Sequence, residues 1–247
     1  MGAVHVMWLR QIKRYWRSRA RMIGMLGQPV LFLLALGFGL GPIFQAAGQG
    51  DFISFLSPGI VAMTVLFSAM FSGIEVIWDK QFGFLKETLV APVSREKIML
   101  GRTLGGATVA MAQGIIVLLI TVLIGFRPTW ALIIPALLFM FAIAFLFTSF
   151  GIAIASKLED MQAFPLIMNF IIMPIFFLSG ALFPLDNIPS ILEIITRFNP
   201  LTYGVDGLRG ALTGVSHLGF ALDAGVIVAL CAIVFMLGSY LFSKVEI

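Results

Sequence analysis

Six long apolar stretches, nearly free of charge, limit what this chain can fold into more than any other feature. An α-helix needs roughly 20 apolar residues to cross the hydrocarbon core of a membrane, where its backbone groups must bond to each other. The Phe-rich, non-alternating pattern disfavours a lipid-facing β-barrel. The sequence therefore predicts a single all-α integral membrane domain over residues 1–247, with six transmembrane helices at 22–44, 52–77, 103–126, 130–156, 161–183 and 224–243.

The composition agrees with a chain that lies mostly in lipid. Hydrophobic residues make up 60% of the chain and charged residues 11%, and the mean hydropathy is +1.05. Soluble domains carry about 25% charged residues, so this chain could not build a soluble surface. The single cysteine, Cys231, and the isolated His5 and His217 predict neither an intrachain disulfide nor a metal site.

The basic residues predict how the spans are oriented. With a cytoplasmic N-terminus, 13 of the 16 Lys and Arg residues fall on the cytoplasmic side, and only Arg127, Arg197 and Arg209 lie outside. Cytoplasmic loops of membrane proteins carry an excess of Lys and Arg, and the opposite orientation would break this rule almost everywhere. We therefore expect both termini in the cytoplasm.

The N-terminal segment 4–21 has two opposite faces at helical spacing. Its apolar face holds Val4, Trp8, Ile12, Tyr15 and Trp16, and its basic face holds Arg10, Lys13, Arg14, Arg17 and Arg21. This pattern predicts an amphipathic helix lying in the cytoplasmic membrane interface. It fits two roles, a specific role in gating or a simple anchor that orients the first span.

The connection 79–102 is long for a loop between spans, and residues 81–90 alternate apolar and charged side chains at helical spacing. Pro92 would end this helix, and Ser94 could cap the next one. A short amphipathic helix on the cytoplasmic face suits docking into a groove of a partner, but also rest on lipid headgroups. Phe82, Phe84 and Leu85 need an apolar partner of one kind or the other.

The stretch 184–221, between the fifth and sixth predicted spans, is richer in apolar residues than an ordinary extracellular loop. Phe183, Pro184 and Pro189 punctuate the exit of the fifth span, and Asn199-Pro200 divides the two apolar segments that follow. Half-apolar helices broken by proline can dip partway into a membrane. We expect a pair of re-entrant helices here, with an extracellular loop as the alternative.

The motifs of several enzyme classes are missing. The sequence has no G-x-x-x-x-G-K-[ST] phosphate loop and no H-E-x-x-H or G-x-S-x-G motif. Glu75 is the one ionisable residue that falls inside a span, and we expect a structural role near the cytoplasmic edge rather than proton relay. Amides such as Gln113 and Asn169 more often join helices than bind a substrate. An intramembrane enzyme and an ion-coupled carrier are therefore both disfavoured.

The order of these segments resembles the permease subunit of an ABC-2 type exporter, which has the type V ABC fold. The likeness covers essentially the whole chain, and its motifs are individually loose. Ala91 departs from the usual Thr or Ser, which puts a local helix-ending hydrogen bond in doubt. The matching residues are Phe82-Gly83-Phe84-Leu85-Lys86-Glu87-Thr88-Leu89-Val90-Ala91-Pro92-Val93-Ser94, then Leu100-Gly101-Arg102, and later Phe183-Pro184 to Pro189 and Asn199-Pro200-Leu201-Thr202-Tyr203.

The resemblance implies a membrane subunit that binds no ATP itself and is driven by two separate ABC ATPase subunits, which bind ATP and Mg²⁺. It also implies pairing with a second copy or a similar permease, in the plasma (inner) membrane of a prokaryote, with lipid but no nucleic acid as a partner. The expected ATPase-coupling residues are Phe82, Gly83, Leu85, Lys86, Glu87 and Pro92. The expected interfacial-helix residues are Trp8, Arg10, Arg14, Trp16 and Arg17. The expected outer-gate residues are Phe183, Pro184, Pro189, Asn199 and Pro200, and the expected substrate path holds Asn169, Met173, Phe176 and Phe177.

The cargo is the least constrained feature. The spans lack the acidic or amide-rich belt that would indicate a sugar chain, and the sequence most resembles the drug and lipid branch of these permeases. We expect outward movement of a hydrophobic or amphipathic compound, with polysaccharide or lipid-linked glycan export as the alternative. A non-transporting scaffold or regulator and an ion-coupled secondary carrier are the hypotheses of other classes.

Overall fold

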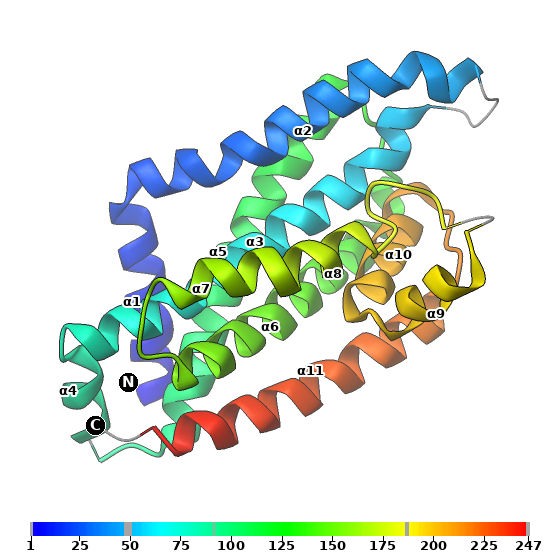
Figure 1. Ribbon diagram of the computed structural model, residues 1–247. Coiled ribbons are helices and arrows are strands. Elements are labelled where there is room, and N and C mark those ends of the chain that lie inside the picture. Colours follow the sequence, from blue (N-terminus) through cyan, green and yellow to red (C-terminus); the bar gives the residue numbers. More distant parts are fainter. Residues whose placement is uncertain (1, 47–50, 91, 186–187, 246–247) are drawn as a thin grey trace.

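The computed structural model describes residues 2–46, 51–90, 92–185 and 188–245, together with most of their side chains (Figure 1). The side chain of Lys86 and the whole of Ala91 lie outside this description. Every regular element in the described ranges is helical. The elements are α1 (Ala3–Arg17), α2 (Arg19–Ala46), α3 (Phe52–Gln81), α4 (Phe84–Val90), α5 (Arg95–Ile124), η1 (Trp130–Leu132), α6 (Ile133–Lys157), α7 (Ala163–Ile167), η2 (Met168–Ile172), α8 (Met173–Phe177), α9 (Ser190–Phe198), α10 (Pro200–Thr213) and α11 (Phe220–Ser243).

Five helices in the described part of the chain are long and apolar enough to cross a membrane. They are α2, α3, α5, α11 and the continuous η1–α6 segment. The predicted span at 161–183 is not among them, because its helical part covers only Ala163–Phe177. At 1.5 Å per residue that helix is shorter than a hydrocarbon core of about 30 Å. The expectation of six spans is therefore not confirmed, because the fifth is a shorter, interrupted helix.

The interruption in the fifth predicted span has a local cause. η2 is a turn of π-helix that separates α7 from α8, and Pro174 follows it in the first turn of α8. Proline has no N–H to donate to the preceding turn, so the regular i to i−4 ladder cannot continue through it. Single π-turns inside helices are rare and are frequently found at functional sites. Asn169 lies within this turn.

Helix α3 is the most buried of the long helices, and α2, α5 and α6 pack against it, whereas α11 packs against α6 and α10. Most of the apolar length of α3 is buried, whereas α2 and α11 are mostly exposed on the surface of the bundle. Glycines allow the closest approaches: a Cβ added to Gly73 would lie 2.5 Å from the carbonyl oxygen of Gly151 on α6. One added to Gly59 would lie 2.0 Å from the oxygen of Ala181. Small residues at such positions let helix backbones approach without the hydrophobic driving force that water supplies.

The long helices run back and forth, so the molecule has two ends. The N-terminus, the C-terminus and α4 lie at one end, which we call the proximal end (Figure 1). Helices α9 and α10 lie at the other, distal end, and α2 runs along one side of the bundle (Figure 1). The two termini therefore share the end that holds the predicted coupling helix.

Two helices, α9 and α10, lie between the fifth predicted span and α11, at the distal end. α9 packs weakly, and its apolar residues Ile191, Ile194 and Phe198 are exposed. α10 instead packs against α3, α6 and α11, and most of its side chains are buried. Asn199 begins α10 as its N-cap and accepts a hydrogen bond from the backbone N–H of Leu201.

Candidate functional site

The N-terminal helix α1 packs along α5, a contact that its amphipathic pattern did not predict. Gly101 and Gly105 on α5 allow this contact, since an added Cβ would lie 2.6 Å from the Cβ of Met7 or of Gln11. The indole Nε1 of Trp8 donates to Thr108 Oγ1 at 3.1 Å. The amide of Gln113 donates to the Tyr15 hydroxyl at 2.7 Å, so this amide joins helices, as expected.

Burial changes the chemistry of the α1–α5 contact. Tyr15 is buried, and its burial raises the pKa of the phenol, although the Gln113 hydrogen bond and the nearby charge of Arg21 oppose this shift. The ring is therefore neutral and acts as a hydrogen-bonding wedge between the helices. Trp16, on the other side of α1, is 64% exposed and fits an anchor at headgroup depth. Arg17 is also exposed.

A buried carboxylate connects three helices at the proximal end. Asp79, near the end of α3, accepts from Arg102 of α5 at 2.6 Å. Its other oxygen accepts from Arg10 at 3.0 Å and from Arg14 at 3.4 Å, both on α1. The side chains of Asp79 and Arg102 are only 3% and 1% exposed. Charges buried this deeply require partners, because an unpaired ion in a low dielectric is strongly destabilised.

Glu75 lies one turn before Asp79 and extends the same ion-pair network. It pairs with Arg21 at the start of α2, and Arg14 approaches its Oε2 to 4.0 Å. Its carboxylate is 7% exposed, so it does not reach water as expected from its place near the cytoplasmic edge. The structure instead gives it arginine partners, in agreement with a structural role. We call Arg10, Arg14, Arg21, Glu75, Asp79 and Arg102 the proximal ion network.

Helix α4 is anchored to the core of the chain by one apolar side chain and presents other side chains to the outside. Leu85 is 2% exposed and belongs to the core of the chain itself. Phe82 and Phe84 are 73% and 52% exposed, and the guanidinium of Arg10 lies 5.9 Å from the centre of the Phe84 ring. Glu87 is exposed. The exposed side chains at this place are therefore Phe82, Phe84 and Glu87, while Leu85 anchors α4.

The turns around α4 are also defined. Gly83 precedes α4 with a φ of 79°, a conformation that side chains other than glycine rarely adopt. Pro92 follows α4 and precedes Ser94, which occupies the N-cap position of α5. The Ser94 side chain makes no capping hydrogen bond, contrary to the predicted cap. Lys80 donates to the carbonyl oxygens of Ser156 and Leu158, which fastens the end of α3 to the end of α6.

Sequence reasoning missed the central pair of the network. Asp79 and Arg102 were expected only as the limits of a cytoplasmic loop at 79–102, but both lie inside long helices. The available signal was the spacing of Glu75 and Asp79, which are four residues apart and therefore share one face of a helix. An acidic pair on one face, with an amphipathic helix rich in arginine elsewhere, is compatible with ion pairing. The partners themselves depend on tertiary packing.

The expected outer-gate residues lie at the distal end, but they do not form one cluster. Asn199 is buried and donates to the Ile175 carbonyl oxygen at 2.6 Å, which ties the start of α10 to α8. Pro200 is the first residue of α10. Phe183 and Pro189 are exposed, and Pro184 is half-buried beside a distal cavity.

The four candidate residues for a substrate path face different ways. Phe176 is buried and packs edge-to-face on Phe67 of α3, with the ring centres 6.0 Å apart. Met173 is half-buried, whereas Asn169 and Phe177 are exposed on the surface of the bundle. The exposed amide of Asn169 therefore has no hydrogen-bond partner within the described part of the chain. It requires water, a cargo or another protein.

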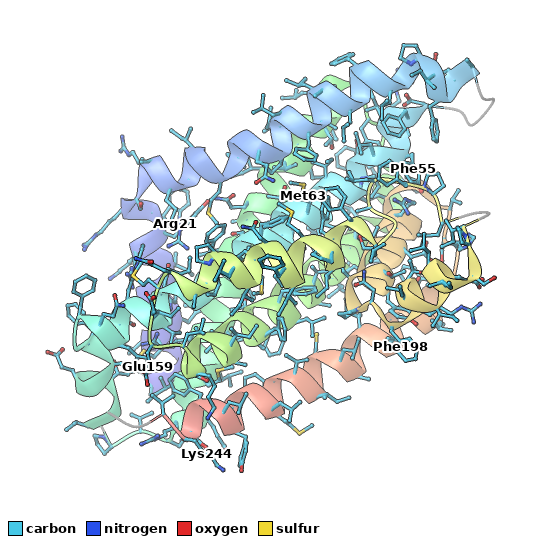
Figure 2. All side chains as sticks on the ribbon, viewed as in Figure 1. Arg21, Phe55, Met63, Glu159, Phe198 and Lys244 are labelled. Carbon is cyan, nitrogen blue, oxygen red and sulfur yellow. The ribbon has the colours of Figure 1, made fainter. Side chains whose placement is uncertain are left out.

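A second feature of the surface was not predicted: two adjoining cavities between α2 and α3. One, of about 210 Å³, is lined by Gln28, Met63 and Phe67 among others. The next, of about 240 Å³, is lined by Arg21, Ile74 and Trp78. Both also contact Met25 and Phe71, so together they form a groove that we call the α2–α3 groove. Figure 2 shows Arg21 at its proximal end and Met63 near the middle of the bundle.

The bundle of long apolar helices, with charges concentrated at the end that holds α1 and α4, defines a polytopic helical membrane protein. Comparison with known proteins identifies which kind. Residues 2–213 match the family described as ABC-2 type transporter. This chain belongs to that family, whose members are membrane transport subunits that associate with an ABC ATPase.

Curated relatives resemble the chain over most of its length. The putative transport permease ycf38 of Cyanophora paradoxa is 29% identical over 231 residues, which cover 88% of this chain and 80% of that protein. Nodulation protein J of Rhizobium leguminosarum bv. trifolii is 26% identical over 233 residues, which cover 93% and 88%. The ycf38 permease of Pyropia yezoensis is 29% identical over 215 residues, which cover 84% and 72%.

Proposed function

We propose that this chain is the membrane-spanning permease subunit of an ATP-driven exporter and that it moves a hydrophobic or amphipathic compound outward. A separate pair of ABC ATPase subunits would bind ATP and Mg²⁺ and supply the energy. The complex would lie in the plasma (inner) membrane of a prokaryote, with the proximal end in the cytoplasm. Two copies of this chain, or this chain and a similar permease, would complete the membrane part.

The observation that carries the proposal is the arrangement of α4. Leu85 of α4 is a buried anchor, whereas two aromatic residues, Phe84 at the start of α4 and Phe82 just before it, are exposed. Exposed aromatic residues of this size are enriched at protein interfaces, where they fill pockets of a partner. The proximal ion network lies directly behind α4, through the contact of Arg10 with Phe84. A push on α4 would therefore reach α1, α3 and α5 together.

The α2–α3 groove supports the choice of an apolar cargo. Its lining combines Met25, Met63, Phe67 and Phe71 with only a few polar groups such as Gln28 and Thr64. Methionine and aromatic side chains adapt to apolar molecules of varied shape. The exposed Asn169 and Phe177 of the fifth predicted span are further positions that a cargo or a second copy could contact. Together these residues form the proposed translocation path.

The proposal is tested by the stimulation of the ATPase. The gene for the ATPase subunit would be co-expressed, the complex would be reconstituted in liposomes, and ATP hydrolysis would be measured. Phe84→Ala and the double variant Phe82→Ala/Phe84→Ala should lose most of the stimulation and co-purify less ATPase. Loss of interface aromatics of this kind costs about 2 kcal/mol or more, which corresponds to a decrease in affinity of about thirtyfold.

The matched control is Phe198→Ala, since Phe198 is 85% exposed on α9 at the opposite end. This variant should bind the ATPase as the wild type does. Equal stimulation by the wild type and the Phe82/Phe84 variant would refute the docking assignment. Glu87→Lys extends the test to charge, because Glu87 is exposed and carries no role in the core.

Two other classes of function are separated by the same reconstituted system. A scaffold or regulator would bind the ATPase without moving any compound, and a secondary carrier would transport without ATP and stop when the ion gradient collapses. The alternative cargo, a polysaccharide or lipid-linked glycan, predicts that a glycan rather than an amphipathic dye is moved across the vesicle membrane. Each outcome is read directly from vesicle transport with and without ATP.

A further inference from the structure

A further cavity, separate from α4 and from the α2–α3 groove, lies at the distal end of the molecule and has the features of a ligand site. Its volume is about 400 Å³, and it is lined by parts of the chain that are far apart in sequence. Phe44 and Phe55 come from the distal ends of α2 and α3, Arg209 and Thr202 come from α10, and Leu218 comes from the connection to α11. Figure 2 shows Phe55 at this end of the bundle.

The cationic group of this cavity, Arg209, is held at one nitrogen, and its Nε is left without a hydrogen-bond partner by the described residues. One guanidinium nitrogen of Arg209, Nη2, donates to the Gly180 carbonyl oxygen at 2.8 Å, and the guanidinium carbon lies 4.3 Å from the centre of the Phe55 ring. The Nε of Arg209 is buried without a hydrogen-bond partner among the described residues. A guanidinium offers five N–H donors in a planar fork that suits carboxylate and phosphate oxygens.

A second donor without a partner among the described residues belongs to Thr202, which lies about two turns before Arg209 on α10 and lines the same cavity. Thr202 is 2% exposed, and within the described part of the chain its hydroxyl oxygen has no hydrogen-bond partner. Buried polar groups in proteins are almost always paired, so an exception beside a cavity calls for an explanation. A ligand oxygen is one explanation that satisfies both groups.

The acidic residue of the cavity, Asp206, is already occupied. Its carboxylate accepts from the backbone N–H groups of His217 and Leu218 at 2.9 Å and 2.7 Å, and from the hydroxyl of Ser216 at 3.2 Å. These bonds fix the turn after α10. Asp206 also attracts Arg209, but burial outweighs this attraction and lowers the pKa of the guanidinium to about 10. Arg209 is therefore a buried cation that its neighbours only partly neutralise.

From this geometry we propose that the distal cavity binds an anionic head group, a phosphate or a carboxylate, carried on an apolar body. Arg209 and Thr202 hold the oxygens of the head group, and the rings and aliphatic side chains of Phe44, Phe55 and Leu218 contact the apolar part. Two sources share this chemistry, a membrane phospholipid and an exported amphipathic anion. The inference goes beyond the proposed function, because binding at this cavity requires no ATPase.

Binding is measured on the purified chain in nanodiscs of phosphatidylcholine, with radiolabelled dodecyl phosphate as the probe. Arg209→Gln should weaken binding about tenfold or more, since it removes a charge-assisted bond, and Thr202→Val about threefold to tenfold, since it removes a neutral one. Unlabelled dodecanoate should displace the probe, whereas dodecyltrimethylammonium, which carries a positive head, should not.

The matched control is Thr148→Val. Thr148 on α6 is buried and, within the described residues, its hydroxyl also lacks a partner, but it does not line this cavity. It should bind the probe as the wild type does. Thr202→Val keeps the shape of its side chain, so it tests the proposal even if Arg209→Gln fails to fold. Wild-type affinity in Thr202→Val together with displacement by the cationic detergent would overturn the proposal.

Mass spectrometry of lipids that co-purify with the chain separates the two sources. An anionic phospholipid retained by the wild type and lost from Thr202→Val assigns the cavity to membrane lipid. Probe binding without any retained phospholipid assigns it to an amphipathic cargo. Absence of both probe binding and retained lipid refutes the site. None of these measurements includes the ATPase, so failure here is distinct from failure of the proposed export function.

Discussion

The guanidinium of Arg102 lies 2.6 Å from Oδ2 of Asp79, and both side chains are almost completely buried between α5 and α3. The same carboxylate also holds Arg10 and Arg14 of α1. One acidic residue therefore fastens the N-terminal helix and two long helices at the point from which α4 departs. Such an arrangement makes the proximal end a single mechanical unit, and it leads to predictions that do not require knowledge of the cargo.

Removal of Arg102 should destabilise the protein strongly. Arg102→Met keeps much of the length but leaves Asp79 with only its half-exposed partners, and breaking a buried ion pair costs about 3–5 kcal/mol. The measurement is the unfolding temperature in detergent, followed by tryptophan fluorescence. The matched control is Arg197→Met, because the Arg197–Glu193 pair is exposed and is worth at most about 1 kcal/mol. Equal shifts for the two variants would contradict the assigned burial.

Exchange of the charges of Arg21 and Glu75 should separate pairing from packing. Arg21→Glu and Glu75→Arg each place like charges together at the start of α2, and each should lower both stability and ATPase stimulation. The double variant restores opposite charges, so it should recover a part of both. A double-mutant cycle for residues in contact gives interaction energies of about 0.5–3 kcal/mol. Strictly additive effects would show that the two side chains do not interact.

A side chain at Gly105 should push α1 away from α5. An added Cβ would lie 2.6 Å from the Cβ of Gln11, so Gly105→Val overpacks the contact, at a cost of about 1–3 kcal/mol. Gly27→Val on α2 is the control, because a Cβ there meets no atom within 4 Å. The unfolding temperature and the ATPase stimulation of the two variants are compared. If α1 lies free on the membrane surface, Gly105→Val will behave like its control.

The exposed amide of Asn169 should face a second copy of the chain or the space between two copies. In a Cys231→Ala background, which removes the single native cysteine, Asn169→Cys should form a crosslinked dimer in membranes with a short bifunctional thiol reagent. Met236→Cys is the control, since Met236 is 62% exposed on α11, a different helix from the one that holds Asn169. Crosslinking at 236 but not at 169 would move the interface away from the fifth predicted span.

Some features of this protein depend on one segment of the sequence alone, and others depend on how the segments pack. Hydropathy locates five of the long helices, because a span requires a continuous apolar run that can be counted in the sequence. It fails for the fifth predicted span, where the helix covers only Ala163–Phe177 and is interrupted by a π-turn and Pro174, although the composition stays apolar. The amphipathic pattern of α4 is also local, but the division between buried Leu85 and exposed Phe84 depends on where α4 meets the bundle.

Sequence alone establishes the class of this protein, since the length, order and apolarity of its segments are enough to place it in a membrane, and the resemblance of its motifs indicates the ABC-2 permease family. The proximal ion network and the distal cavity arise only in the folded chain. Asp79 and Arg102 are 23 residues apart and Phe55 and Arg209 are far more distant in the chain, and a sequence pattern carries no information on which charges or rings will meet. Those meetings depend on how the helices pack, for example where Gly106 lets α5 approach Ser72 of α3 and Gly105 lets it approach α1.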